Sequence, residues 1–142
     1  METMTMATAQ RLTNAQKASM QMMCDCQKPI VEGAWEEYAS RLEALGDTLL
    51  KLPKIYSQDK LAYDAIVYAH YFVGATDFFV TERDGNDMFG YAILNGDYEM
   101  AEFGYLSLSE LKSIPGLNLD FYWDETTLRN ALTNVSDYFN YL

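Results

Sequence analysis

The fold is decided by residues 66–106, which read IVYAHYFVGATDFFVTERDGNDMFGYAILNGDYEMAEFGYL. Four runs in this stretch are rich in β-branched and aromatic residues, and such runs favour extended strands. They cover residues 66–73, 77–82, 88–94 and 101–106. The turn sequences Asp84-Gly85-Asn86 and Asn95-Gly96-Asp97 separate the last three runs and are typical of β-hairpins. The stretch therefore predicts an antiparallel meander of four strands.

Helices are predicted before the meander. Residues 7–27 are mostly good helix formers without internal glycine or proline, but Leu12 is the only large branched apolar side chain among them. This helix therefore has a weak packing face and is a candidate for self-association. Residues 31–51 predict a second helix, because one apolar stripe recurs at helical spacing. The stripe consists of Trp35, Tyr38, Leu42, Leu45 and Leu49.

Further elements are predicted after the meander. Ser107 and Glu110 have the spacing of a capping box and predict a short helix, which Pro115-Gly116 ends. Residues 119–123 are a candidate fifth strand. Asp124 is expected to cap a last helix over residues 125–139.

The fold class predicted from these elements is α+β. A four- or five-stranded antiparallel meander would bury one face against helices, with the helix at 31–51 and the C-terminal helix as the best candidates to cover it. The predicted organisation is an N-terminal helical extension at 1–51, followed by an antiparallel α+β domain at 52–142. A chain of 142 residues is long enough to bury a sizeable core.

The cysteines and the hydropathy pattern indicate a cytoplasmic protein. Cys24 and Cys26 lie one residue apart, so a disulfide between them would be strained and would close almost no loop. No apolar run approaches the 18 residues of a membrane span. The first ten residues are polar and threonine-rich, unlike a secretory signal.

The negative charge is concentrated in one part of the chain. The formal net charge is −11, with 21 acidic and 10 basic residues. Residues 1–34 carry three of each sign, whereas residues 63–142 carry 13 acids and three bases, net −10. This distribution disfavours direct nucleic-acid binding, which needs clustered lysine and arginine, and favours attraction to a basic protein.

No catalytic, cofactor-binding or metal-binding residue is predicted. His70 is the only histidine, and strand alternation places it with Ile66, Tyr68 and Phe72, where a structural histidine is expected. A catalytic role is the alternative, although no serine or cysteine is marked as its partner. Cys24 and Cys26 have neither the spacing nor the second ligand pair of a structural zinc site. The scattered glycines form no phosphate-binding motif.

Seven carboxylates form the predicted partner-binding set, and they fall within 26 residues that contain one base, Arg83. They are Asp77, Glu82, Asp84, Asp87, Asp97, Glu99 and Glu102. One interpretation is a solvated acidic face with acidic turns. The other is that the carboxylates imitate a line of phosphates and occupy the basic groove of a nucleic-acid enzyme, with aromatic neighbours as buried anchors.

From residue 52 onward the chain resembles a family of small uncharacterised domains carried by phages, plasmids and integrative elements. The resemblance covers about residues 52–128 and rests on four segments: Leu52–Gln58, Phe78–Glu82, Met88–Tyr91 and Glu102–Leu111. The last segment, EFGYLSLSEL, is close to the family pattern E-L-G-Y-F-S-L-x-E-L. The resemblance assigns no catalytic residue. It implies a mobile-element setting, where small accessory proteins often counter host defence.

Three functional hypotheses follow. The first is an inhibitor of a host nucleic-acid-targeting defence enzyme, of the anti-CRISPR or anti-restriction kind, that acts by a steric or a DNA-mimic block. The second is a non-inhibitory interaction module that self-associates or docks through the helix at 7–27, since methionine-rich faces adapt to many partners. The third is a small enzyme centred on His70.

Overall fold

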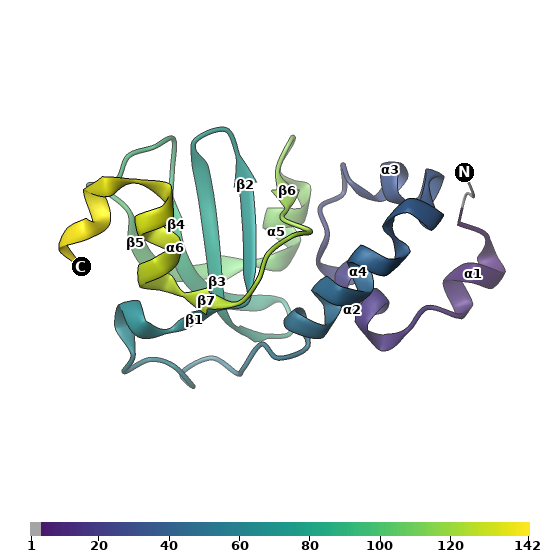
Figure 1. Cartoon of the computed structure of the whole chain (residues 1–142), viewed down its shortest axis with the longest axis horizontal. Coiled ribbons are helices and arrows are strands. Elements are labelled where there is room, and N and C mark those ends of the chain that lie inside the picture. Colours follow the sequence, from purple (N-terminus) through teal and green to yellow (C-terminus); the bar gives the residue numbers. More distant parts are fainter. Residues whose placement is uncertain (1–3) are drawn as a thin grey trace.

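The computed structural model describes residues 4–142. Four helices come first: α1 (Met6–Gln10), α2 (Asn14–Met22), α3 (Lys28–Gly33) and α4 (Trp35–Leu49). A 3₁₀ turn, η1 (Ala62–Asp64), leads into β1 (Ile66–Val67), β2 (Ala69–Val73), β3 (Thr76–Asp84), β4 (Asp87–Ile93) and β5 (Glu102–Ser107). The chain ends with α5 (Leu108–Ser113), β6 (Asn118–Leu119), β7 (Thr126–Thr127), α6 (Leu128–Val135) and η2 (Asp137–Tyr141). The helices α1–α4 gather at one end of the long axis and the sheet at the other (Figure 1).

The predicted α+β class is confirmed. All strand pairs are antiparallel, and the main sheet has the order β5-β4-β3-β2-β6, so β2 to β5 form the meander and β6 adds a fifth strand. One predicted strand is divided: the run at 66–73 breaks at Tyr68, because Val67 pairs with Thr126 in a separate two-stranded sheet, β1-β7.

The predicted boundaries of three helices need correction. The helix at 7–27 is interrupted, because Thr13 and Gln16 form a capping box that starts α2 afresh. The helix at 31–51 starts only at Trp35, because Ala34 has a non-helical backbone conformation. The last helix is capped by Thr127 rather than Asp124, because Thr126 and Thr127 are extended and pair with β1. It also ends at Val135 rather than at 139, because Ser136 is extended and the 3₁₀ turn η2 follows. The short helix α5 does begin after Ser107, whose hydroxyl accepts from the Glu110 N–H.

The two helices α2 and α4 cross at very short range. A Cβ atom built on Gly46 would lie 1.8 Å from the backbone oxygen of Ala15, so only glycine allows this approach. The Ser19 hydroxyl, which is buried, donates to the Leu42 carbonyl over 2.7 Å at the same crossing. Gly46 is therefore a packing requirement of the helical region.

One side of the sheet, the inner face, shares a core with the helices. Its side chains include Ala69, Tyr71, Phe78, Val80 and Met88, all buried. They belong to one cluster with residues from the N-terminal helices and α5, among them Met22, Met23, Leu42, Leu45 and Leu111. The Tyr71 hydroxyl donates to the Met22 carbonyl over 2.6 Å. Met22, the last residue of α2, and Met23, its C-cap, are therefore used to cover the sheet within the chain.

The opposite side, the outer face, is also covered, so the prediction of one buried face is wrong. Phe79, Tyr91 and Ile93 are buried in a second cluster with Leu128 and Leu132 of α6. Figure 1 shows α6 lying in front of the strands, near the C-terminus. Toward the hairpin between β3 and β4, the segment 52–65 takes over the covering role from α6, as contacts of Tyr56, Gln58 and Tyr63 show.

Candidate functional site

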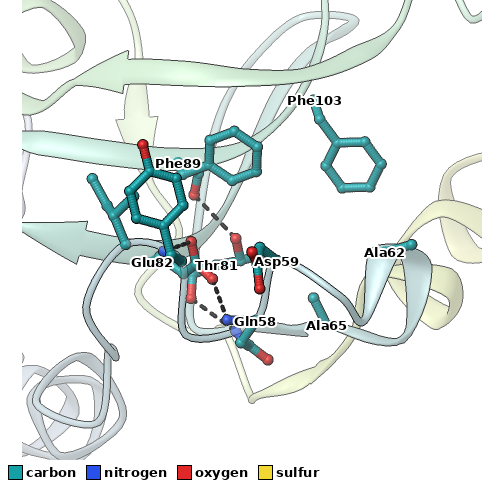
Figure 2. Close-up of a pocket in the computed structure, with 10 residues that line it drawn as sticks. Gln58, Asp59, Ala62, Ala65, Thr81, Glu82, Phe89 and Phe103 are labelled. Atoms are coloured by element: carbon teal, nitrogen blue, oxygen red, sulfur yellow. Dashed lines mark hydrogen bonds between the residues drawn. The ribbon is translucent and has the colours of Figure 1, made fainter.

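A cleft of about 370 Å³ lies between the segment 52–65 and the outer face of the sheet. Figure 2 shows the rings of Phe89 and Phe103 on one side, and Ala62 and Ala65 on the other, with Asp59 between them. The cleft is lined by Ile55, Tyr56, Gln58, Asp59, Ala62, Ala65, Thr81, Glu82, Phe89 and Phe103. Its size and mainly apolar walls are typical of a ligand-binding pocket.

A β-bulge in β3 creates the floor of this cleft. Strand pairing shifts between Val80 and Glu82, so that Val80 faces Gly90 but Glu82 faces Phe89. Simple alternation from Phe79 would place Glu82 on the inner face, whereas the extra residue brings it to the outer face beside Phe89. The Glu82 side chain is therefore part of the cleft and not of the helical core.

The Glu82 carboxylate holds the covering segment by two hydrogen bonds from the backbone. The N–H of Tyr56 donates to Oε1 over 3.0 Å and the N–H of Gln58 donates to Oε2 over 2.5 Å (Figure 2). Glu82 is 2% exposed and has no ion-pair partner among residues 4–142. Burying a charge without a cation is costly, and these charge-assisted bonds offset part of that cost.

Gln58 forms the second clamp. Its amide nitrogen donates to the carbonyls of Ile66 and Thr81 over 3.0 and 2.9 Å, and its amide oxygen accepts from the Ile66 N–H over 2.7 Å. The Pro53 carbonyl accepts from the Arg83 N–H over 2.9 Å nearby. The segment is thus fixed to β3 mainly by polar contacts with the backbone.

The walls of the cleft contain strained backbone. Tyr56 and Ala62 have φ values of 78° and 50°, in the left-handed region that side chains other than glycine rarely adopt. Such conformations persist where neighbouring contacts impose them, and they cluster at functional sites. For Tyr56 the imposing contact is the hydrogen bond to Glu82.

Aromatic side chains frame the opening. Tyr56 and Tyr105 are 68% and 63% exposed, and their hydroxyls lie 2.9 Å apart. The Phe89 and Phe103 rings are stacked with 6.2 Å between centroids, and Tyr105 meets Phe89 edge-on at 5.3 Å. The outer face therefore offers several ring surfaces at a site that also contains the carboxylates of Asp59 and Glu82.

The structure separates the seven predicted partner-binding carboxylates. Glu82 is buried in the clamp, and Asp77 accepts from His70 Nε2 over 2.7 Å. The other five are exposed: Asp84, Asp87, Asp97, Glu99 and Glu102. Asp77 and Asp84 lie near opposite ends of β3, which at ~3.3 Å per residue are about 23 Å apart, so the seven do not form one contiguous line.

Two exposed acidic groups result. The hairpin-end group consists of Asp84, Asp87 and Glu110. Glu110 belongs to it because Asn86 at the hairpin accepts hydrogen bonds from the backbone N–H groups of Leu108 and Ser109, which hold the start of α5 beside the hairpin. The loop-end group consists of Asp97, Glu99, Glu102 and Asp137. Asp137 belongs to it because the neighbouring Tyr138 of η2 contacts Tyr98, with 5.6 Å between ring centroids. None of the seven carboxylates in the hairpin-end and loop-end groups has an ion-pair partner in the described chain.

His70 lies between two carboxylates on the outer face. Nε2 is 2.7 Å from Asp77 Oδ1 and Nδ1 is 3.1 Å from Asp120 Oδ2. Its ring stacks on Phe79 at 4.8 Å and on Phe72 at 5.4 Å. Of the companions predicted for it, Phe72 is confirmed as a neighbour, whereas the break at Tyr68 moves Ile66 into the β1-β7 pair.

The electrostatics favour a charged His70. Burial lowers its pKa, but the hydrogen bonds with Asp120 and Asp77 outweigh burial and raise the net pKa above the usual 6.5. The hydrogen bond from His70 lowers the pKa of Asp120. When the ring is protonated, both nitrogens donate to carboxylates, and His70 then joins β2, β3 and the segment after β6.

The cysteines are free. Cys24 is buried, and burial raises the pKa of its thiol to about 12, while the exposed Cys26 donates through Sγ to the Leu117 carbonyl over 3.2 Å. Within residues 4–142 no three side chains among histidine, cysteine, aspartate and glutamate are grouped to hold a metal ion. No described helix is both long and apolar enough to cross a membrane.

Comparisons with known proteins give no identification: no family model matches the chain, and no match is found among curated proteins or solved structures. The resemblance to mobile-element domains therefore stays a prediction.

Apart from Glu82, the residues that line the cleft were not predicted as site residues. Tyr56 and Gln58 lie in the segment Leu52–Gln58 that carries the resemblance, and Phe89 lies in Met88–Tyr91. The structure shows what these segments do, since they close the clamp on β3 and wall the cleft. Phe103 lies in a further segment of the resemblance, Glu102–Leu111, whereas Asp59 gave no signal of its own, because the covering of the outer face by this loop was not predicted.

Proposed function

We propose that this is a non-catalytic acidic binding protein that docks a basic protein surface, and that it inhibits a nucleic-acid-targeting defence enzyme by blocking its basic groove. The observation that carries the proposal is the set of seven exposed carboxylates in the hairpin-end and loop-end groups, which have no ion-pair partner within the described residues. Exposed like charges of this kind attract and orient an oppositely charged partner.

The separation of the two groups supports contact along an extended surface. They lie at opposite ends of strands about 20 Å long, a span that covers several phosphates of a nucleic-acid backbone. The aromatic side chains of the outer face lie between them and supply anchors that exposed charge alone lacks.

The surroundings of His70 support the non-catalytic part of the proposal. A general base needs a free ring nitrogen within reach of a substrate, and both nitrogens of His70 already bind carboxylates. The hydrogen bonds of the His70 ring go to the two aspartates, and its ring contacts within the described chain are with Phe72, Phe79 and Trp123, so no serine or cysteine hydroxyl or thiol is bonded to it.

The test is capture of partners from a nuclease-treated lysate of a candidate host at increasing salt, followed by an activity assay of the captured enzyme. We expect a basic nucleic-acid enzyme that is lost steeply with salt and is inhibited by the pure protein. Capture that is independent of salt, or a captured enzyme whose activity is unchanged, would contradict the proposal.

Matched triple variants locate the surface. Neutralising three carboxylates of either acidic group should weaken binding about fivefold, since each exposed ion pair contributes little alone, whereas neutralising three carboxylates on α4 should not. The variants are Asp84→Asn/Asp87→Asn/Glu110→Gln, Asp97→Asn/Glu99→Gln/Glu102→Gln and the α4 control Glu37→Gln/Glu43→Gln/Asp47→Asn. Equal weakening by the control would show that net charge matters and the location of the charges does not.

A further inference from the structure

We infer that the outer-face cleft is a binding site for one cationic side chain, arginine or lysine, of the basic partner. This inference rests on the proposed function, because that partner supplies the cation.

The aromatic rings that line the cleft can attract a cation. Phe89, Phe103 and Tyr56 line the cleft, and an aromatic ring face carries negative electrostatic potential. A guanidinium or ammonium group within about 6 Å of such rings is attracted, and the attraction grows where water is partly excluded. Phe103, Ala62 and Ala65 line the same cavity, so the ring of Phe103 borders the cleft (Figure 2).

The charged side chains that line the cleft also favour a cation. Asp59 and Glu82 both line the cleft, and no lysine or arginine is among its lining residues. Glu82 is buried without a cation, although buried charges in proteins are usually paired. Asp59 is exposed, and its carboxylate makes no ion pair among residues 4–142. The site therefore carries two negative charges that a bound cation would balance.

The covering segment of the cleft is pre-organised for binding. The clamps by Glu82 and Gln58 fix the covering segment before any ligand arrives, so binding does not have to order it. The strained φ at Tyr56 places that side chain at the opening, where its hydroxyl meets the hydroxyl of Tyr105. Fixed walls reduce the entropy lost on binding.

The negative charge of the cleft also determines which kind of side chain it can bind. A purely apolar side chain would fit the walls but would leave Glu82 and Asp59 without a counter-charge, and a carboxylate or phosphate would be repelled by them. A cation with a long apolar stem satisfies both features, since the stem contacts the alanines and rings while the head lies near the carboxylates.

The experiment is a titration of the full-length protein with N-acetyl-arginine amide, followed through the aromatic proton and carbon resonances of Phe89 and Phe103. N-acetyl-citrulline amide is the neutral control, because it has nearly the same shape without the charge. We expect shifts at both rings and an affinity for the arginine probe at least about fivefold higher, with the difference shrinking as salt rises.

Two variants sharpen the result. Asp59→Asn, at an exposed position, should reduce the preference for arginine over citrulline about twofold to threefold, while Glu43→Gln on α4 should leave it unchanged. Phe103→Leu keeps an apolar side chain but removes the ring face, and should abolish most of the preference.

Equal affinity for the arginine and citrulline probes, or no shift at either ring with both probes, would overturn the inference. If salt-sensitive capture of a basic enzyme persisted in that case, the cleft assignment would fail and the proposed function would stand. If the cleft preferred arginine but no basic partner were captured, the proposed function would fail and the cation site would stand.

Discussion

The two faces of the sheet are covered in different ways. The inner face is closed by side-chain packing against helices, and its buried residues include Tyr71, Val80 and Met88. The outer face is covered partly by α6 and partly by the segment 52–65, whose backbone N–H groups donate to Glu82 and whose Gln58 side chain donates to the Thr81 carbonyl. Close packing leaves little space, whereas a loop held at a few polar points leaves a cleft. The two faces therefore differ in packing: side chains close the inner face, and the outer face contains the cleft.

The largest effect is expected on the helical side. Gly46→Ala places a methyl group within 1.8 Å of the Ala15 carbonyl oxygen, so α2 and α4 must move apart. We expect the free energy of unfolding to fall by about 3 kcal/mol, measured by urea denaturation. Gly33→Ala is the control, because a Cβ there meets no atom within 4 Å. Equal stability of the two variants would show that the helix crossing is looser than described.

The next largest effect is expected at the clamp. Glu82→Gln replaces an acceptor of two N–H groups by an amide that can accept only at its oxygen, and we expect a loss of about 2 kcal/mol. Hydrogen exchange should speed up at the amides of Tyr56 and Gln58 while the amides of α4 keep their protection. Faster exchange spread evenly over the chain would contradict a local clamp on the outer face.

A smaller, pH-dependent effect is expected at His70. Its pKa is raised in the folded state, so the stability it contributes is present below pH 6.5 and is lost as pH rises through the raised value. Asp120, with a lowered pKa, adds stability above pH 3.8 that is lost as pH falls through the lowered value. Denaturation midpoints from pH 3 to 9 should show a maximum between these limits that is weaker in His70→Gln. An unchanged profile in that variant would contradict a charged His70.

The smallest effect is expected at the opening. Tyr105→Phe removes the hydroxyl that meets Tyr56, and both side chains are exposed, so the denaturation midpoint should not change. The hydrogen bond with Tyr56 raises the pKa of Tyr105, so ultraviolet titration of the variant should lose one high-pH tyrosine ionisation. A clear drop in stability would mean that the opening supports the fold as well as framing the cleft.

Much of the sheet was predictable because its signals are local. The hairpin at Asp84-Gly85-Asn86 and the alternating strands around it determine pairing between neighbours in sequence. The interruption of the first helix also had a local signal, the Thr13 and Gln16 capping box, which the composition of residues 7–27 obscured. The start of α6 had no such signal, because β7 exists only through its pairing with the distant β1.

The site was predictable only in part, for a physical reason. Five of the seven predicted carboxylates are exposed, as turn and strand-end positions indicate, but Glu82 depends on a bulge. One extra residue in β3 reverses which face a side chain occupies, and the sequence near Thr81 carries no sign of it. The cleft requires in addition that the segment 52–65 fold over β3, which is a tertiary contact between parts of the chain about 25 residues apart.

The most direct test of the account is hydrogen exchange of the complex captured from the lysate, compared with the free protein. We expect slower exchange in the segment 53–65 and at the β3–β4 hairpin, with no change in α2 and α4. That result would place the partner on the outer face. Protection confined to α2 and α4, with unchanged exchange at 53–65, would contradict the account and assign binding to the helices.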